Sequence, residues 1–309
     1  MSDCGPGLTD DQWEKIRQIV HDDALRAREA ASFLPLYGPL PGSTVTVPQD
    51  RLSFEPLPDG LSGEASPSAA TGATQQYMRV DDYDQLRIAT VAVNVYLKNH
   101  MIADPELAAA SVLFSRAAKI VARVEDSIIF NGWPSNLQHV RPVYTITGAN
   151  SYDGLVSHAR ESSPQIDDAN PGVFGPDVFR AVVSAIADLE RRGYYKPYAC
   201  VLANDLFTEI NRPIQNSMVL PAESIPPFLD GPLLRSSSLQ LGKGLVISLQ
   251  GNPVEIVVPN DISVRYLQGM LDGQHAFRIA QRFVLRVKDW DAVALIQRKA
   301  PPSGIAGDA

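Results

Sequence analysis

The chain is poor in the residues that most often build chemical sites. Its 309 residues include two cysteines and five histidines. Cys4 lies near the N-terminus and Cys200 in an apolar run, so we expect no structural disulfide and a reducing compartment, the cytoplasm. The histidines are scattered, and no two have the spacing of metal ligands. The sequence therefore predicts no catalytic residue, no metal site and no cofactor site.

Long hydrophobic runs and an excess of positive charge are also missing. No apolar run approaches the length of a membrane span, and the N-terminus lacks the basic-then-apolar order of a signal peptide. The chain carries 35 acidic and 27 basic residues, for a net charge of -8. We therefore expect no membrane partner and no nucleic-acid partner, since nucleic-acid binding favours a basic surface.

The common catalytic and phosphate-binding motifs are absent. There is no Gly-x-Ser-x-Gly element, and Gly242 to Gly244 lacks the spacing of a phosphate loop. The acidic group from Asp81 to Asp84 is a candidate cation site, but a solvated loop is the more frequent outcome. Three arginines alternate along the predicted strand Phe277 to Val287. A solvated or salt-bridged sheet face is more common for such a row than a phosphate site.

The chain does contain one long periodic helix. Apolar residues recur at alternating steps of three and four from Leu107 to Ile128, which places them on one stripe. Asp104 can cap the start and Gly132 follows the last turn, so the pattern predicts a helix from Asp104 to Asn131. At 1.5 Å per residue this helix is about 40 Å long, which suits the backbone element of a plate-like subunit.

A second helix and a projecting arm are predicted before it. Thr9 and Gln12 have the spacing of a capping box for an amphipathic helix that fades near Ser32. Residues 43–75 are rich in Pro, Gly, Ser, Ala and Thr, and a long extended segment, Tyr77 to Tyr96, follows. We expect a hairpin arm that pairs with a neighbouring subunit, because unpaired strand edges seek partners. A disordered linker is the alternative.

The second half of the chain mixes one helix with several strands. The pattern predicts a helix from Gly175 to Arg192, a strand from Tyr198 to Leu202 and a long Pro-rich loop from Asn211 to Pro232. Strands then fill the remainder. Leu245 to Leu249 and Val254 to Val258 are predicted to pair as a hairpin.

Three stretches, taken in order, carry a resemblance to a known family. They are Val124 to Gly132, Lys196 to Leu202, and Asn260 to Tyr266. Followed by the arginine-bearing strand and a final strand from Ala292 to Ile296, this ordered set resembles the classical encapsulin nanocompartment shell proteins. The resemblance extends over roughly Leu8 to Gln297. It implies an α+β fold, the fold of tailed-phage major capsid proteins.

The resemblance also implies how the chain is divided. In order, there would be an N-terminal arm with a lumen-facing helix, an extended loop, a peripheral domain with the long spine helix, an axial domain and a flexible tail. The corresponding ranges are 1–44, 45–95, 96–139 together with 259–300, 140–258, and 301–309.

Site residues follow from the resemblance by position. In the family an apolar groove on the inner wall binds the C-terminal targeting peptide of a cargo enzyme. The candidates here are Ile16, Val20, Phe33, Leu34, Leu36, Asp261, Ile262 and Tyr266. The Pro-rich loop would lie near the five-fold pore, with Arg212 and Glu223 as pore-loop candidates. Some relatives bind a flavin through a Trp near the three-fold axis; the matching residue here is Tyr96, which disfavours flavin binding.

The implied function is that of a self-assembling, non-enzymatic shell protein of an icosahedral compartment. Its partners would be identical copies and a cargo enzyme of oxidative stress or iron storage, such as a peroxidase or a ferritin-like protein. Two alternatives stay open: a phage or prophage major capsid protein that packages nucleic acid, and a small-molecule enzyme with an unrecognised site. The amphipathic N-terminal helix and the acidic balance favour the shell protein over the phage capsid.

Overall fold

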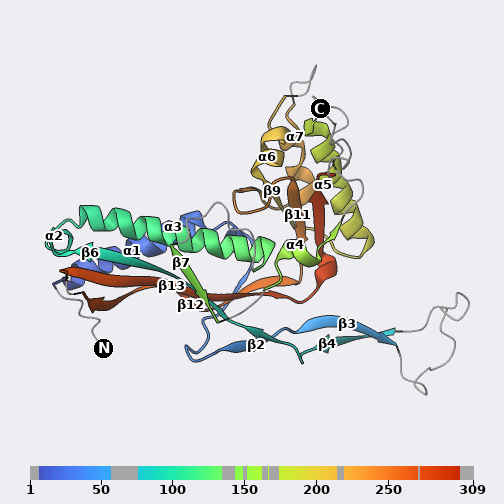
Figure 1. Ribbon diagram of the computed structural model, residues 1–309. Helices are drawn as coiled ribbons and strands as arrows, with labels where there is room; N and C mark the ends of the chain where they lie inside the picture. The colour runs from blue at the N-terminus through green and yellow to red at the C-terminus, as the bar shows by residue number, and fades with distance from the viewer. Residues whose placement is uncertain are drawn as a thin grey trace, which may run out of the picture.

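Two lobes and an arm make up the part of the chain that the computed structural model describes (Figure 1). That part comprises residues 7–56, 76–133, 143–148, 152–161, 166, 174–213, 219–270 and 272–299. The long lobe follows the spine helix, the short lobe stands at one end of it, and the arm projects away from the junction of the two. One apolar cluster fills the long lobe and continues onto one face of the short-lobe sheet, and a second lies within the short lobe.

The long lobe is a five-stranded sheet with two helices on one face. Its strand order is β1-β12-β13-β6-β7. The bounds are Leu36–Tyr37 for β1, Val254–Gly269 for β12, Gln274–Val287 for β13, Ala89–Lys98 for β6 and Tyr144–Thr147 for β7. All neighbours are antiparallel except β1, which runs parallel to β12. A short helix, α2 (Asn99–Ile102), follows β6.

The N-terminal helix α1 (Asp10–Ala27) starts at the predicted capping box. The Thr9 hydroxyl accepts from the Gln12 backbone N–H, and the Gln12 side chain accepts from the Thr9 N–H. Trp13 and the residues that follow at helical spacing are buried against the sheet and the spine helix. Helix α1 runs parallel to the spine helix: Lys15 near its start forms an ion pair with Glu106, just before the spine helix, and Asp23 near its end pairs with Lys119 in the middle of that helix. A 3-10 turn, η1 (Ala30–Ser32), follows.

The spine helix α3 spans Ala108–Asn131, so the predicted start at Asp104 was four residues too early. Leu107 adopts a left-handed backbone conformation with φ of 53°, which interrupts the helix after Pro105. The Asp104 carboxylate still caps the helix, since it accepts from the backbone N–H of Ala108 at 3.0 Å. The predicted apolar stripe is confirmed, and the ring of Phe114 packs edge-on against Phe277 of β13.

The arm is a hairpin of β3 (Arg51–Pro56) and β4 (Gln76–Asp81), and its tip lies outside the described residues. The predicted single segment from Tyr77 to Tyr96 is instead three strands, β4, β5 (Gln85–Arg87) and β6. Breaks at Asp82–Asp84 and Ile88 let β5 pair with β2 (Thr46–Pro48). The chain of residues 42–50 that leads into the arm is called the strap below.

The short lobe has a second five-stranded sheet, in the order β10-β9-β11-β14-β8. Its strands are β10 (Leu233–Ser236), β9 (Tyr198–Ala203), β11 (Lys243–Ser248), β14 (Val293–Gln297) and β8 (Arg160–Glu161). The helices of this region are α4 (Leu155–His158), α5 (Phe174–Arg191), α6 (Asn204–Ile210), α7 (Pro221–Ser224) and α8 (Pro226–Leu229), with a 3-10 turn, η3 (Trp290–Ala292). Helix α5 buries the predicted face that begins at Val178.

Two sequence-based expectations about this region differ from the structure. The predicted hairpin of β11 and β12 was wrong: β11 pairs with β9 and β14, whereas β12 pairs with β13 and β1. The turn between them carries the chain from one lobe to the other, with Asn252 at φ 52°. The structure also places β14, which the predicted ranges put in the peripheral domain, in the sheet of the short lobe.

Candidate assembly and cargo-binding sites

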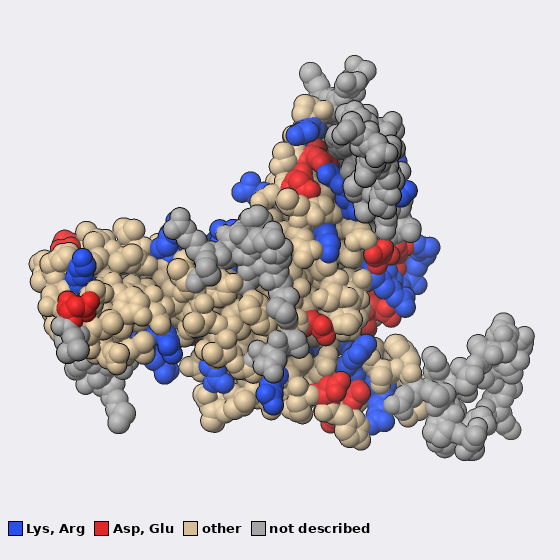
Figure 2. Space-filling view, viewed as in Figure 1, with Lys and Arg blue, Asp and Glu red and all other residues tan. Residues whose placement is uncertain are grey.

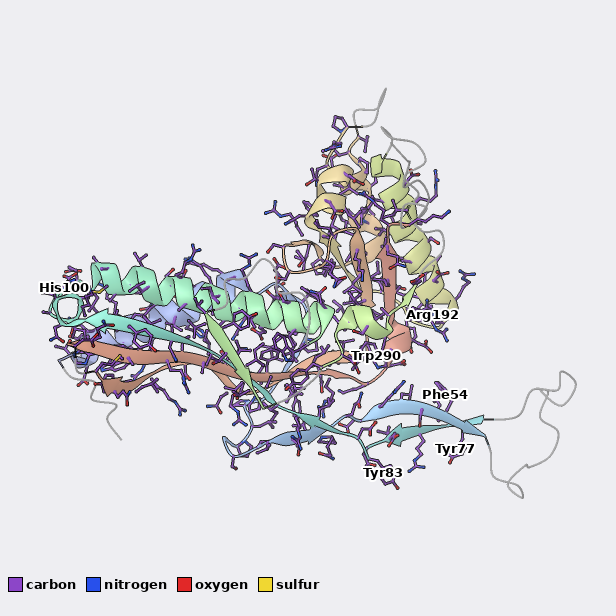
Figure 3. All side chains as sticks on the ribbon, in the orientation of Figure 1. Phe54, Tyr77, Tyr83, His100, Arg192 and Trp290 are labelled. Carbon is purple, nitrogen blue, oxygen red and sulfur yellow. The ribbon has the colours of Figure 1, made fainter. Side chains whose placement is uncertain are left out.

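The arm presents an uncovered apolar face. Phe54 lies opposite Met78 and Leu52 opposite Val80, so these four side chains share one face of the hairpin. Phe54, Met78 and Val80 are 53%, 69% and 56% exposed. Figure 3 shows Phe54 on the hairpin, below the short lobe and apart from it. A two-stranded ribbon has no core in which to bury such residues, so this face is a candidate contact between subunits.

Two arginines of β13 hold the base of the arm. Arg282 donates through its guanidinium group to the carbonyl oxygens of Gly42 and Thr44 in the strap. Arg286 is buried and forms an ion pair with Asp50 at 2.7 Å. Charge-assisted hydrogen bonds of this kind are roughly twice as strong as neutral ones. This part of the predicted arginine row is therefore a bonded sheet face that positions the arm.

A buried polar junction joins α1, the spine helix and the sheet. Arg28, just after α1, forms ion pairs with Glu125 of the spine helix at 2.9 Å and with Asp261 of β12 at 2.7 Å. Gln281 of β13 donates to Glu125 at 2.8 Å. Arg28 and Glu125 are 5% and 1% exposed. Because a buried charge needs a partner, these contacts fix the end of α1 against the long lobe.

The next residue of the spine helix extends the junction to the short lobe. The two carboxylate oxygens of Asp126 accept from the backbone N–H groups of Glu29 and Ala30, both at 2.9 Å. The Glu29 carboxylate accepts from the backbone N–H of Ser237, which follows β10. One turn of chain after α1 therefore contacts the spine helix and the short lobe together.

Burial sets the ionisation of this junction. Burial, followed by the neighbouring Glu125, raises the pKa of Asp126 well above its usual value. Burial likewise raises the pKa of Glu125, against the opposing effect of Arg28. Burial alone would lower the pKa of Arg28, but Glu125 and Asp261 outweigh it, and the pKa rises. Arg28 therefore stays charged, and the two acids hold protons more tightly than they would in water.

Sequence reasoning missed this junction. Adjacent helix residues such as Glu125 and Asp126 point in different directions, and no motif gave either of them a partner. Both are 1% exposed and both are bonded to chain that follows α1. The available signal was their position between Val124 and Ile128 of the apolar stripe. Two acids at core positions indicate burial with partners, since Asp and Glu are otherwise almost never fully buried.

Half of the predicted cargo-groove residues lie in the core of the long lobe. Ile16 and Val20 are 0% and 1% exposed, and both belong to the cluster beneath α1. Leu34 and Ile262 are buried in the same cluster. The side chains of these four residues belong to the core and are not on the surface of the chain.

The other predicted groove residues are at least partly accessible. Leu36 is 51% exposed on β1, Asp261 is exposed, and Phe33 and Tyr266 are partly buried against the core. Leu36 pairs with Ile256 of β12, ten residues before Tyr266 on the same strand. At about 3.3 Å per residue, the accessible positions extend over roughly 33 Å. This distance fits an extended peptide of about ten residues along β12.

The remaining predicted positions lie in three separate places. Arg212 is exposed after α6, and Glu223 is exposed on α7; residues 214–218 between them lie outside the described chain. Tyr96, the position matched to a flavin-binding Trp, is 48% exposed on the open face of the sheet. The structure therefore leaves both pore-loop positions accessible at the outer end of the short lobe.

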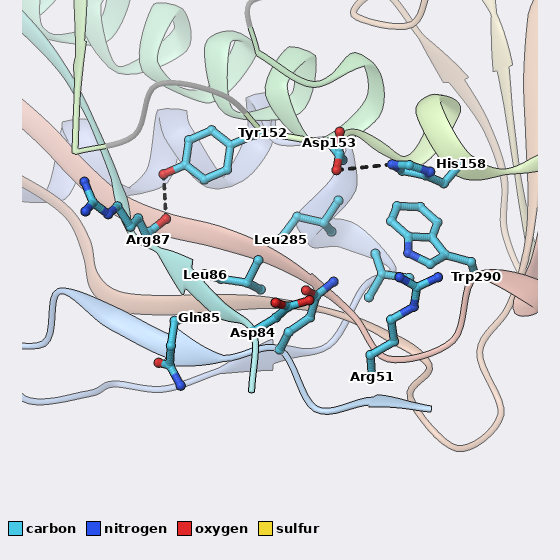
Figure 4. Close-up of a pocket in the computed structure, with 12 residues that line it drawn as sticks. Arg51, Asp84, Gln85, Leu86, Arg87, Tyr152, Asp153, His158, Leu285 and Trp290 are labelled. Atoms are coloured by element: carbon cyan, nitrogen blue, oxygen red, sulfur yellow. Dashed lines mark hydrogen bonds and ion pairs between the residues drawn. The ribbon is translucent and has the colours of Figure 1, made fainter. Parts of the chain in front are cut away.

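A cavity of about 580 Å³ lies between the arm base and the lobes (Figure 4). Tyr152 donates its hydroxyl to the carbonyl oxygen of Arg87 at 2.7 Å, and burial raises the pKa of that hydroxyl. His158 lies 3.1 Å from Asp153 and packs against Trp290 at 4.9 Å between ring centroids. Sequence reasoning did not find this cavity, because its walls come from segments far apart in the chain.

Across the described ranges, no three His, Cys, Asp or Glu side chains are grouped so as to hold a metal ion. None of the helices in those ranges is long and apolar enough to cross a membrane.

Comparison with known proteins decides the family. Residues 5–284 match the family described as "Encapsulating protein for peroxidase". The chain belongs to this family, the encapsulins. It is 25% identical over 293 residues to the type 1 encapsulin shell protein EncA of Myxococcus xanthus, covering 94% of this chain and 93% of that one. It is 24% identical over 296 residues to a diheme-cytochrome-encapsulin shell fusion protein of Kuenenia stuttgartiensis, covering 94% of this chain and 74% of the relative.

Solved structures give the same fold for this encapsulin. A virus-like particle from Pyrococcus furiosus superposes with a TM-score of 0.63 at 13% identity, over 92% of this chain and 99% of that one. The capsid of the Myoviridae phage XM1 superposes with a TM-score of 0.55 at 13% identity, over 86% and 90% of the two chains. The predicted tailed-phage capsid fold is therefore confirmed.

The junction of this encapsulin predicts a pH dependence. A carboxyl group whose pKa is raised by folding costs stability as pH rises from about 4, its usual pKa, through the raised value. Asp126→Asn removes that titration. We expect the thermal midpoint of assembled Asp126→Asn protein to fall less between pH 5 and pH 8 than that of the parent. Equal falls, measured by scanning calorimetry, would show that Asp126 does not titrate in this window.

The contacts of the strap predict that removing Arg282 increases hydrogen exchange near the strap. Arg282→Gln removes the charge that binds the Gly42 and Thr44 carbonyl oxygens, a loss of about 1.5–3 kcal/mol for hydrogen bonds to a charged group. We expect the Ile88 amide, which donates to Val45 in the strap, to lose about 10- to 100-fold of its hydrogen-exchange protection. Lys98→Gln, an exposed cation at the far end of β6, is the control and should leave that amide unchanged. Unaltered exchange in Arg282→Gln would mean that the strap is held by other contacts.

Proposed function

We propose that this chain assembles into the closed icosahedral shell of a bacterial nanocompartment and encloses a cargo enzyme. Membership in the encapsulin family and the capsid fold support the shell role. The observation that carries the proposal is the arm, whose apolar face around Phe54 and Met78 is uncovered in the isolated chain. Exposed apolar surface and open strand edges favour association with another copy.

A projecting arm is what a closed shell of identical subunits requires. A contact in which the arm of one copy binds the body of the next is heterologous, and repeated rotation about symmetry axes closes such contacts into a shell. The arm direction must then be reproducible, and Arg282 and Arg286 give the strap several charge-assisted bonds that hold it. The shell needs no catalytic residue for this role, so we assign the chemistry to the cargo.

The cargo site proposed is the inner wall beside α1 and β12. The accessible residues Phe33, Leu36, Asp261 and Tyr266 would contact an extended C-terminal peptide, and the core residues Ile16, Val20, Leu34 and Ile262 would support that wall. The family description supports a peroxidase as cargo. A ferritin-like protein of iron storage is the second candidate cargo. A multimeric cargo enzyme would dock several such peptides at once, which raises the overall affinity without new contacts.

The shell role also suggests a cellular location and a route for small reactants. We assign the shell to the cytoplasm, where a cargo enzyme can be enclosed as the shell forms. The exposed Arg212 and Glu223 at the outer end of the short lobe would line a pore for small reactants. Neither nucleic acid nor membrane is assigned as a partner, in keeping with the net charge of -8.

The assembly proposal is tested on the arm. Phe54→Glu places a charge on the apolar face, and we expect most of that protein to sediment as single chains or small oligomers, while the parent sediments as a large particle. Phe54→Leu keeps the face apolar and serves as the matched control. Large particles from Phe54→Glu would exclude this face as the contact, and a parent protein that stays small would exclude the shell function itself.

The cargo proposal needs a surface substitution, because an acidic residue at the fully buried Ile16 would disrupt the core. We expect Leu36→Asp shells to capture about ten-fold less of a monomeric reporter that bears an extended apolar C-terminal peptide, since burying one leucine contributes about 1.5–3 kcal/mol. Leu241→Asp changes an equally apolar, 68% exposed position in the short lobe and is the control. Undiminished capture by intact Leu36→Asp shells would place the groove elsewhere.

A further inference from the structure

The open face of the long-lobe sheet carries two arginines side by side. Arg265 of β12 lies directly opposite Arg278 of β13, and both are exposed. Arg278 donates to the side chain of Asn94, the next residue across on β6, at 3.0 Å. Like charges directly opposite each other destabilise a sheet. The repulsion within such a pair is relieved when an anionic group binds to it.

The described part of the chain places no anionic group against the pair. The open-face neighbours of the pair are small or uncharged: Ser263 and Ala280 on one side, Ala276 on the other. Within the described ranges, no carboxylate forms an ion pair with Arg265 or Arg278. The other face of the same strands is covered by α1 and α3, so the arginines point away from the helices. Figure 2 shows Lys and Arg side chains spaced along this margin of the long lobe.

An acidic turn on the arm has the charge opposite to that of the arginine pair, and it too lacks an ion-pair partner among the described residues. Asp82 and Asp84 are exposed between β4 and β5, beside Tyr83, which is 77% exposed. Asp81 accepts from the backbone N–H of Tyr83, which keeps the turn compact. No described basic side chain forms an ion pair with Asp82 or Asp84. Figure 3 shows Tyr83 at the edge of the arm, away from the long-lobe helices.

The two charged surfaces do not meet within one chain. The turn is tied to the strap, because the backbone N–H of Gln49 donates to the Asp84 carbonyl oxygen at 2.9 Å, and the adjacent Asp50 pairs with Arg286. Arg278 lies eight residues earlier on the same strand, which is about 26 Å away at 3.3 Å per residue. Surfaces of opposite charge held this far apart on a rigid subunit fit a head-to-tail contact between copies.

We propose that Arg265 and Arg278 receive the acidic turn, residues 81–84, of a neighbouring copy in the shell. The inference rests on the proposed shell function and assigns one of its contacts. The occupant is a second copy because its turn matches the site in charge. A polyanion such as nucleic acid is disfavoured by the net charge of -8. Contacts of this kind fix register and partner choice more than they add affinity, and they weaken with salt.

Charge exchange tests the contact. We expect Arg265→Glu/Arg278→Glu to lower the fraction of protein in large particles at least ten-fold at low salt, and Asp82→Lys/Asp84→Lys to do the same. Combining all four substitutions in one chain should restore particles, because opposite charges again face each other. The neutral variant Arg265→Gln/Arg278→Gln should reduce the particle fraction less than charge reversal. Circular dichroism of the unassembled protein confirms that each variant is folded.

Three outcomes would overturn the inference while the parent still assembles. Either charge reversal alone could leave the particle fraction unchanged. The variant that combines all four charge reversals could form no more particles than the two double variants. Nuclease-resistant nucleic acid in parent particles, lost from Arg265→Gln/Arg278→Gln, would identify a polyanion as the occupant. A parent protein that forms no particle would instead contradict the proposed shell function.

Discussion

Burial of two adjacent acids on the spine helix is the constraint on which the packing of α1 against both lobes depends. Glu125 and Asp126 lie where the apolar stripe would continue, so each must be bonded or neutral. Arg28 and the backbone N–H groups after α1 meet that requirement, and Glu29 reaches on to Ser237 of the short lobe. Any movement of α1 would leave a buried carboxylate without partners. The N-terminal helix, the long lobe and the short lobe therefore behave as one unit.

A rigid subunit suits a protein that assembles from many identical copies. In a closed shell every copy must present the same surfaces at the same angles, because small errors in angle accumulate around a symmetry axis. The structure places its charge-assisted bonds accordingly, at the end of α1 and at the base of the arm. The apolar arm face and the exposed arginine pair are left for neighbouring copies. The buried polar contacts thus fix the arrangement of the lobes and the arm, and the exposed surfaces remain for binding other copies.

Local signals predicted the elements well, and the resemblance supplied their order. The Thr9–Gln12 capping box, the spine stripe and the α5 face depend on residues three or four apart, so the sequence shows them directly. Strand partners depend on distant residues, which is why the hairpin of β11 and β12 was wrong. Nor can sequence separate groove from core: Ile16 and Leu36 are both apolar at predicted groove positions, yet one is fully buried and the other half exposed. Ile16 is covered because α1 packs on the long lobe, whereas Leu36 lies on the edge strand β1, and no local pattern records either placement.

The central claim is that this chain is a building block whose fixed geometry serves binding to copies of itself. Electron cryomicroscopy of the purified, unmodified protein tests it most directly. The account predicts hollow, closed icosahedral particles in which the arm of each chain lies on the body of an adjacent chain. Monomers or dimers, or particles in which the arms contact no neighbour, would contradict it.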